Sequence, residues 1–153
     1  MNENPTTTLT GARHRGLILI WGAQVVSLLF LLLLTRLVGA GGGAGGKRTL
    51  LIALAATGLS SVALSFAVKP RLIAQASRER RPDLVTTGYV LAFTLCEACA
   101  LFGLIAHFVT GARESLYLFA PAALGLALHF PRRRHLEAVP EGEGGGANFK
   151  STL

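Results

Sequence analysis

The sequence predicts an all-α, polytopic integral membrane protein with about four transmembrane helices. Its 153 residues are 51% hydrophobic and only 15% charged, against roughly 25% charged in soluble domains. So few charges cannot cover the surface of a soluble domain of this size. The apolar runs are about 20 residues long, which matches the hydrocarbon thickness of a bilayer. The net charge is +7, and the basic residues lie at the ends of these runs. This placement indicates membrane topology and contact with anionic headgroups. We therefore expect no nucleic-acid partner.

The first expected span covers residues 17–36 and follows a cytoplasmic N-terminal tail, residues 1–15, which ends in a basic flank. A basic flank before an apolar run is also found in signal peptides, and Val38-Gly-Ala40 offers small residues for cleavage. The run is longer than the usual signal-peptide core of about 7–15 residues. We therefore favour an uncleaved first helix, with Trp21 near the interface.

The second span is expected over residues 49–68, after a glycine-rich linker at residues 39–46. The linker does not have the spacing of a phosphate-binding loop. Small side chains recur at three- and four-residue steps along the span, which favours close packing of membrane helices. These small residues are Ala53, Ala56, Ser60, Ala63 and Ala67.

The third span, residues 85–109, follows a polar segment from Lys69 to Asp83, which we interpret as a cytoplasmic loop. This span carries a second set of small residues, within a sector of about 80° at 100° per residue. Glu97 projects about 140° from the centre of that sector. The small set comprises Gly88, Ala92, Cys96, Cys99, Gly103 and Ala106.

The fourth span, about residues 115–130, is short and contains Pro121, so it is either a thin span or a re-entrant segment. A basic cluster ends the membrane domain, residues 16–137, and residues 138–153 are expected to be a disordered cytoplasmic tail. With four spans, eleven of the fifteen Lys and Arg residues fall on one side. The positive-inside rule then places both termini in the cytoplasm of a bacterial-type inner membrane.

The pair Cys96 and Cys99 is better explained by packing than by metal binding, because no second pair of ligands has suitable spacing. His107 lies about 15 Å along the helix from these cysteines, and His129 lies at the end of another apolar run. We expect neither a metal nor a cofactor. The sequence contains no Ser-His-Asp set and no paired carboxylates within one span, so no enzymatic activity is expected.

Glu97 is the acid near the middle of the third span. Insertion of a helix with a carboxylate at its centre costs about 3 kcal/mol of free energy on insertion scales. Such a residue is therefore expected to have a structural or functional role. An apolar environment disfavours the charged form of a carboxyl group, and a carboxyl that is protonated near neutral pH suits a proton carrier. The same physics fits a structural acid hydrogen-bonded to a neighbouring helix. From the side chain alone, both interpretations remain open.

The segment from about residue 51 to 109 resembles the helical hairpin of the rotor-ring subunit c of F- and V-type ATP synthases. The likeness rests on a small-residue helix, a basic loop with Arg81-Pro82, and Ala92-Phe-Thr-Leu-Cys-Glu97-Ala-Cys-Ala-Leu-Phe-Gly-Leu-Ile-Ala106. It implies that Glu97 is an ion-binding carboxylate and that the loop faces a catalytic head. The second helix lacks the alternating glycines of that family, and two further helices flank the hairpin, so the chain would be a diverged relative.

We therefore expect a small membrane subunit that binds a proton or cation through Glu97, in a homo-oligomer or a complex with other membrane proteins. The alternative is a structural or assembly protein in which Glu97 only fixes helix packing.

Overall fold

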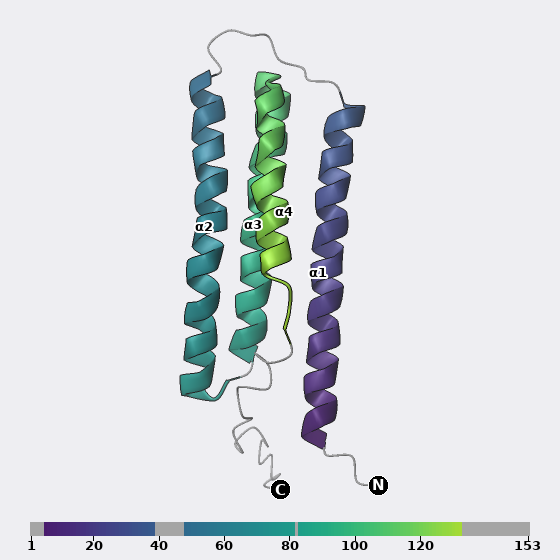
Figure 1. Cartoon of the computed structure of the whole chain (residues 1–153), viewed down its shortest axis with the longest axis vertical. Helices are drawn as coiled ribbons and strands as arrows, with labels where there is room; N and C mark the ends of the chain where they lie inside the picture. Colours follow the sequence, from purple (N-terminus) through teal and green to yellow (C-terminus); the bar gives the residue numbers. More distant parts are fainter. Residues whose placement is uncertain (1–4, 39–47, 82, 133–153) are drawn as a thin grey trace, which may run out of the picture.

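The described part of the chain forms a bundle of three long α-helices and one short α-helix, which a 3-10 helix precedes (Figure 1). The computed structural model describes residues 5–38, 48–81 and 83–132, with side chains from residue 11 onward. The helices are α1 (Pro5–Leu37), α2 (Arg48–Glu79), α3 (Asp83–Thr110) and α4 (Phe119–Leu128), with a 3-10 helix, η1 (Arg113–Leu118), before α4. The expected glycine linker and C-terminal tail lie outside the described residues. The all-α membrane fold predicted from composition is confirmed.

The first helix begins earlier than the sequence analysis expected. Residues 5–15 belong to α1 and do not form a separate tail. Pro5 stands at the first helical residue, where its fixed φ suits a helix and its missing N–H has no intrahelical partner to lose. The uncharged run then continues the same helix through the membrane-length segment.

The second helix runs past its apolar segment to Glu79, so the predicted loop from Lys69 to Asp83 is wrong over most of its length. The residues after Pro70 are mainly good helix formers, and Ile73 and Ala76 pack against the start of α3. The helix ends at Arg80, whose φ of 51° is left-handed. The Arg81 N–H donates to the Ala76 carbonyl oxygen at 3.0 Å, which completes a Schellman-type C-cap.

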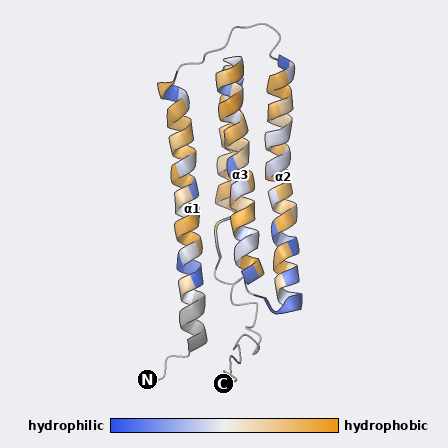
Figure 2. Ribbon diagram, turned by 180° about the vertical axis from the view of Figure 1, so that it is seen from behind, coloured by the Kyte–Doolittle hydropathy of each residue, from blue (hydrophilic) through white to orange (hydrophobic). Residues whose placement is uncertain are grey.

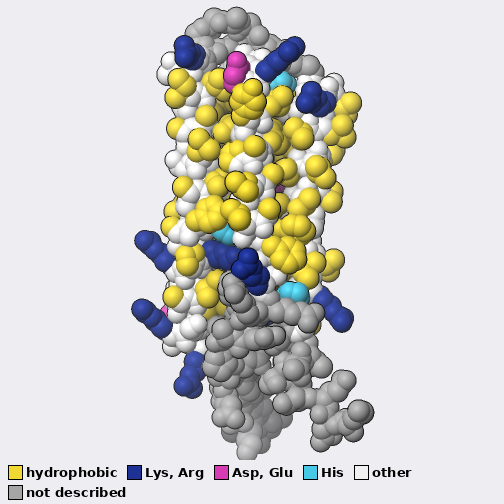
Figure 3. All heavy atoms as spheres, in the orientation of Figure 1, with side chains coloured by type: hydrophobic (Ala, Val, Ile, Leu, Met, Phe, Trp, Pro, Cys, Tyr) yellow, Lys and Arg dark blue, Asp and Glu magenta, His cyan; other side chains and the backbone are white. Residues whose placement is uncertain are grey.

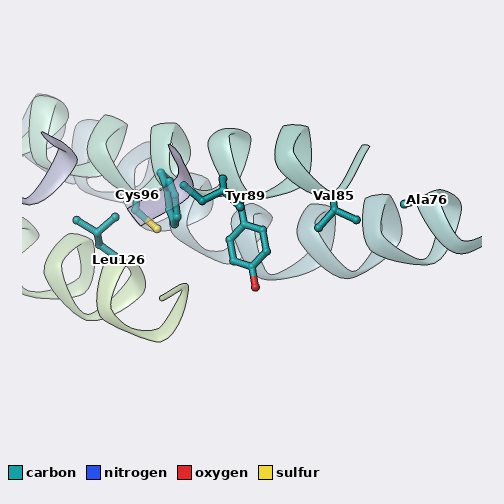
Figure 4. Packing of buried hydrophobic residues seen from close by; sticks show 7 residues of the cluster. Ala76, Val85, Tyr89, Cys96 and Leu126 are labelled. Carbon is teal, nitrogen blue, oxygen red and sulfur yellow. The ribbon is translucent and has the colours of Figure 1, made fainter. Parts of the chain in front are cut away.

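Helix α3 is the centre of the bundle and contacts α1, α2, η1 and α4. Two clusters of buried apolar side chains lie along it. Figure 4 shows the inner cluster as a row that runs from Ala76 and Val85 through Tyr89 and Cys96 to Leu126. The other cluster lies toward η1 and includes Cys99, Leu118 and Phe119. Burial of these two rows holds α2 and α4 on α3.

Among the residues that the structure describes, three helices are long and apolar enough to span a membrane, namely Gly11–Leu37, Arg48–Glu79 and Asp83–Thr110. The ten residues of α4 extend about 15 Å, and the six residues of η1, which lead directly into α4, add about 12 Å. Four α-helices are present in the described part of the chain, as predicted, and residues 115–128 of the fourth predicted span are helical, in η1 and α4, followed by non-helical residues 129–132. Pro131 and the surrounding polar contacts, described below, account for its early end.

The surface of the bundle follows the pattern of a membrane protein. Figure 2 shows apolar colouring over most of the length of the long helices and hydrophilic colouring toward their ends. Figure 3 shows a band of hydrophobic side chains between two groups of basic side chains. The described ends of the chain, at α1 and after α4, point toward the same end of the bundle as the α2–α3 turn (Figure 1). We call this the inner end.

Candidate functional site

Glu97 lies at the middle of α3, fourteen residues after Asp83 and thirteen before Thr110, which places it about 20 Å from either end of the helix. Its side chain is half-buried and faces α1, where the Ser27 hydroxyl donates a hydrogen bond to Glu97 Oε1. Ser27 is itself near the middle of the uncharged run of α1. The carboxyl group therefore lies between two helices at the depth of the bilayer centre. The sequence identified the acid but not its partner helix.

Gln24 is a second polar residue on α1, three residues before Ser27 and so on the same face of the helix. Its Oε1 atom is buried and has no hydrogen-bond partner within the described part of the chain. A buried acceptor without a donor is costly, about 1–3 kcal/mol. The α1–α3 contact thus includes the Ser27–Glu97 hydrogen bond, and α1 carries a second buried acceptor, the Gln24 amide oxygen, about one helical turn from Ser27.

A cavity of about 560 Å³ lies between α1 and α3 and extends from the inner end toward this site. Its lining residues on α3 run from Asp83 to Thr94, and Thr94 lies one turn before Glu97 on the same face. Arg13 lines the cavity from α1, and Asp83 forms a 2.7 Å ion pair with Arg81. Hydroxyl groups of Thr86, Thr87 and Thr94 make this route partly polar.

The small residues of α3 lie in the interior of the chain. The backbone of α2 approaches at Gly58, where an added Cβ would meet Cys99 Sγ at 3.2 Å, and at Gly103 a Cβ would meet Leu118 at 3.0 Å. The two thiols are buried and unbonded to each other. The six predicted packing residues, all buried, are Gly88, Ala92, Cys96, Cys99, Gly103 and Ala106.

The small residues of α2 are placed differently. The set Ala53, Ala56, Ser60, Ala63 and Ala67 is exposed on the outside of the bundle. The face of α2 that packs on α3 instead carries Gly58, Val62, Ser65 and Lys69. Small residues at helical spacing mark a helix face that can pack closely against another helix. They do not show whether that face packs within the chain or remains exposed on its outside. Contact of the exposed set with another helix remains a prediction.

A polar cluster at the end of α4 was not predicted from the sequence. Helix α4 ends near the level of Cys96, where Gly125 and Cys96 are in contact, so its last carbonyl groups lie inside the apolar band. Trp21 Nε1 donates to the Leu126 carbonyl oxygen at 2.9 Å, and the Trp21 ring meets Phe130 edge-to-face at 5.1 Å. Within hydrocarbon, backbone groups need partners of this kind.

The remaining contacts of this cluster tie the non-helical segment to the long helices. His14 Nε2 donates to the Pro131 carbonyl oxygen at 3.4 Å, and the Arg132 N–H donates to the Tyr89 hydroxyl at 3.3 Å. The Ser65 hydroxyl donates its hydrogen bond to the Val62 carbonyl oxygen. Ser65 Oγ therefore accepts the hydrogen bond from His129 Nε2 at 2.9 Å. The signal in the sequence was Pro131 directly after an apolar run, which marks a helix end.

His107 is buried near the end of α3, and its Nδ1 has no partner within the described residues. The structure does not bring His107 to the cysteine pair, whereas His129 lies one side chain away from Cys96, because Ser65 Oγ contacts both His129 Nε2 at 2.9 Å and Cys96 Sγ at 3.6 Å. Among the residues that the structure describes, no group of three His, Cys, Asp or Glu side chains is placed to hold a metal ion. No family model, curated protein or solved structure matches the chain.

Proposed function

We propose that this chain is a small membrane subunit that binds a proton or a small cation at Glu97. The observation that carries the proposal is the position of the carboxyl group: at mid-depth, half-buried and hydrogen-bonded to Ser27. About one turn along α1 from Ser27 lies the buried Gln24 oxygen, which has no partner within the described residues. A carboxyl, a hydroxyl and an amide oxygen are the ligands that hard cations prefer. A protonated carboxyl would satisfy the same site, since its O–H can donate to an acceptor.

The cavity along α3 supports exchange of the ion with one side of the membrane. It leads from the ion pair of Arg81 and Asp83 to Thr94, about 4.5 Å along the helix axis from Glu97. Ionisable groups within a membrane usually face the bundle interior or a water-filled cavity. No route toward the opposite end is required for a carrier that exposes its site by moving against a partner.

The subunit-c-like sequence pattern around Glu97 supports the same proposal, and with it a place in an oligomer or a larger membrane complex. The exposed small residues of α2, from Ala53 to Ala67, offer a face on which a helix of a second copy can approach closely. The basic residues that gather at the inner end favour a cytoplasmic location for that end in a bacterial-type inner membrane. Tags at either terminus would then report cytoplasm, and a tag in residues 39–46 the outside.

Labelling with a hydrophobic carbodiimide tests the ion-binding proposal, because this reagent attacks protonated carboxyl groups in apolar surroundings. In the purified protein, we expect mass spectrometry to find label on Glu97 but not on the exposed Glu114, and the yield to fall as the pH rises. If the site takes a cation, added salt of that cation should lower the yield at constant pH. Absence of label on Glu97 from neutral to mildly acidic pH would count decisively against the proposal.

A structural role is the second candidate, because the Ser27–Glu97 hydrogen bond also joins α1 to α3. A glutamine can replace a neutral carboxyl group in such a bond. The structural role therefore predicts that Glu97→Gln leaves assembly and cell function nearly unchanged. The ion-binding proposal predicts that the same variant folds normally but loses both the label and any ion-dependent function.

A further inference from the structure

Lys69 is a buried cation at the level where α2 leaves the apolar band. Its side chain is only 9% exposed, and its Nζ lies 4.0 Å from the centre of the Tyr89 ring. Twenty uncharged residues, 49–68, separate it from Arg48 at the other end of the span. That separation equals one hydrocarbon thickness, so Lys69 lies at the inner boundary of the bilayer.

The Lys69 ammonium has no described counter-charge. The Arg132 guanidinium lies within electrostatic range of it, as does the His129 ring, which is hydrogen-bonded to Ser65, and His14 contacts the adjoining Pro131. Within residues 11–38, 48–81 and 83–132, no carboxylate lies within salt-bridge distance of Lys69. Figure 3 shows basic and histidine side chains together below the apolar part of α4, with hydrophobic side chains around them.

A buried ammonium without an anion is costly. Contact with the face of a tyrosine ring returns about 2 kcal/mol when the cation is desolvated, and the neighbouring Arg132 adds repulsion. The Lys69 ammonium makes no described hydrogen bond, although three N–H groups are available for donation. An anionic group that accepts hydrogen bonds would balance this charge. Lys69 from α2 and Arg132 from the segment after α4 would be its donors.

We propose that the cluster of Lys69, Tyr89, His129 and Arg132 binds a phosphate group, that of an anionic lipid headgroup or of a soluble phosphate compound. Lys and Arg are the usual donors to phosphate oxygens. The depth of Lys69 coincides with the start of the headgroup layer, where basic pockets between helices hold anionic lipids. A bound phosphate would also join α2 to the end of α4, which closes the inner side of the bundle.

The test is thermal unfolding of the full-length protein in detergent with added phosphatidylglycerol, phosphatidylcholine or inorganic phosphate at matched ionic strength. Phosphatidylglycerol should raise the unfolding temperature more than phosphatidylcholine. Replacement of Lys69 by Gln should weaken the apparent affinity about 5-fold, which corresponds to about 1 kcal/mol for one basic residue near the surface. The exposed Arg71 is two residues away on the same helix, so Arg71→Gln is the matched control and should retain the effect.

Inorganic phosphate distinguishes the two sources. If it reproduces the rise in a Lys69-dependent manner, the ligand is a soluble phosphate compound; if only the lipid acts, the ligand is a headgroup. The exposed Arg132 provides a variant that cannot fail through loss of core packing, and Arg132→Gln should also weaken binding. Equal responses of the Lys69, Arg132 and Arg71 variants, or no rise with either phosphate source, would overturn the proposal.

Discussion

Replacement of Gly125 by Ala should test the packing of α4 on α3. A Cβ at this position would lie 2.7 Å from Cys96 Sγ and 3.3 Å from Val62 Cγ1, and both neighbours belong to packed helices. Overpacking of this kind costs about 1–3 kcal/mol, while the gain in helix propensity returns about 1 kcal/mol. We expect the variant to be destabilised by about 1 kcal/mol. Gly22→Ala, where the new Cβ meets nothing within 4 Å, should show no loss.

The same contact predicts a specific coupling. Replacement of Cys96 by Ala removes the sulfur atom that the new methyl group would meet, so the double variant should be more stable than the sum of the single effects by about 1–2 kcal/mol. Unfolding in mixed detergent micelles, followed by circular dichroism, measures all four species. Additivity within about 0.5 kcal/mol would mean that α4 does not pack against α3 through Gly125 and Cys96.

Four further substitutions test other parts of the bundle by the same unfolding measurement. Gly103→Leu should cost about 3 kcal/mol of stability, because the nearest η1 side-chain carbon is 3.0 Å from the new Cβ. Leu104→Phe, at a half-buried site, should cost less. Equal costs would argue that the small residues of α3 do not form a packing contact. Arg80→Gly should stabilise by about 1 kcal/mol, since glycine removes the penalty of a left-handed residue at φ 51°, and a loss of stability would contradict the assigned C-cap. Trp21→Phe should destabilise by about 1–3 kcal/mol, because the Leu126 carbonyl loses its donor inside the apolar band; a neutral result would mean that water reaches this carbonyl.

The long helices were predictable because the thickness of the bilayer sets the length of an apolar run that crosses it, and such runs are visible in the sequence. The buried face of α3 was also evident, since small residues at helical spacing mark close contacts. The end of α2 was misjudged because Pro70 and a rise in polarity resemble a loop. A helix that leaves the bilayer continues in water if its residues favour helix and one face, here Ile73 and Ala76, still packs.

The candidate site was predictable only in part. Glu97 stands out because an acid in an apolar run is rare, but Ser27 and Gln24 belong to a helix about 70 residues away in the sequence, and spacing within one span says nothing about its partner. The cluster at Lys69 was less predictable than Glu97, because its residues come from separate segments of the chain. It forms because α4 stops halfway, which brings His129 and Arg132 back to α2 and α3.

Infrared spectroscopy of Glu97 tests the central claim most directly. The carbonyl stretch of a protonated carboxyl group is separate from that of a carboxylate, and Glu97→Gln identifies the band that belongs to this residue. If Glu97 binds an exchangeable proton or cation, that band should be present near neutral pH and should fall reversibly as the pH, or the concentration of the competing cation, is raised. A band that is unaffected by pH and by cations, or that is absent throughout, would contradict the ion-binding role of Glu97.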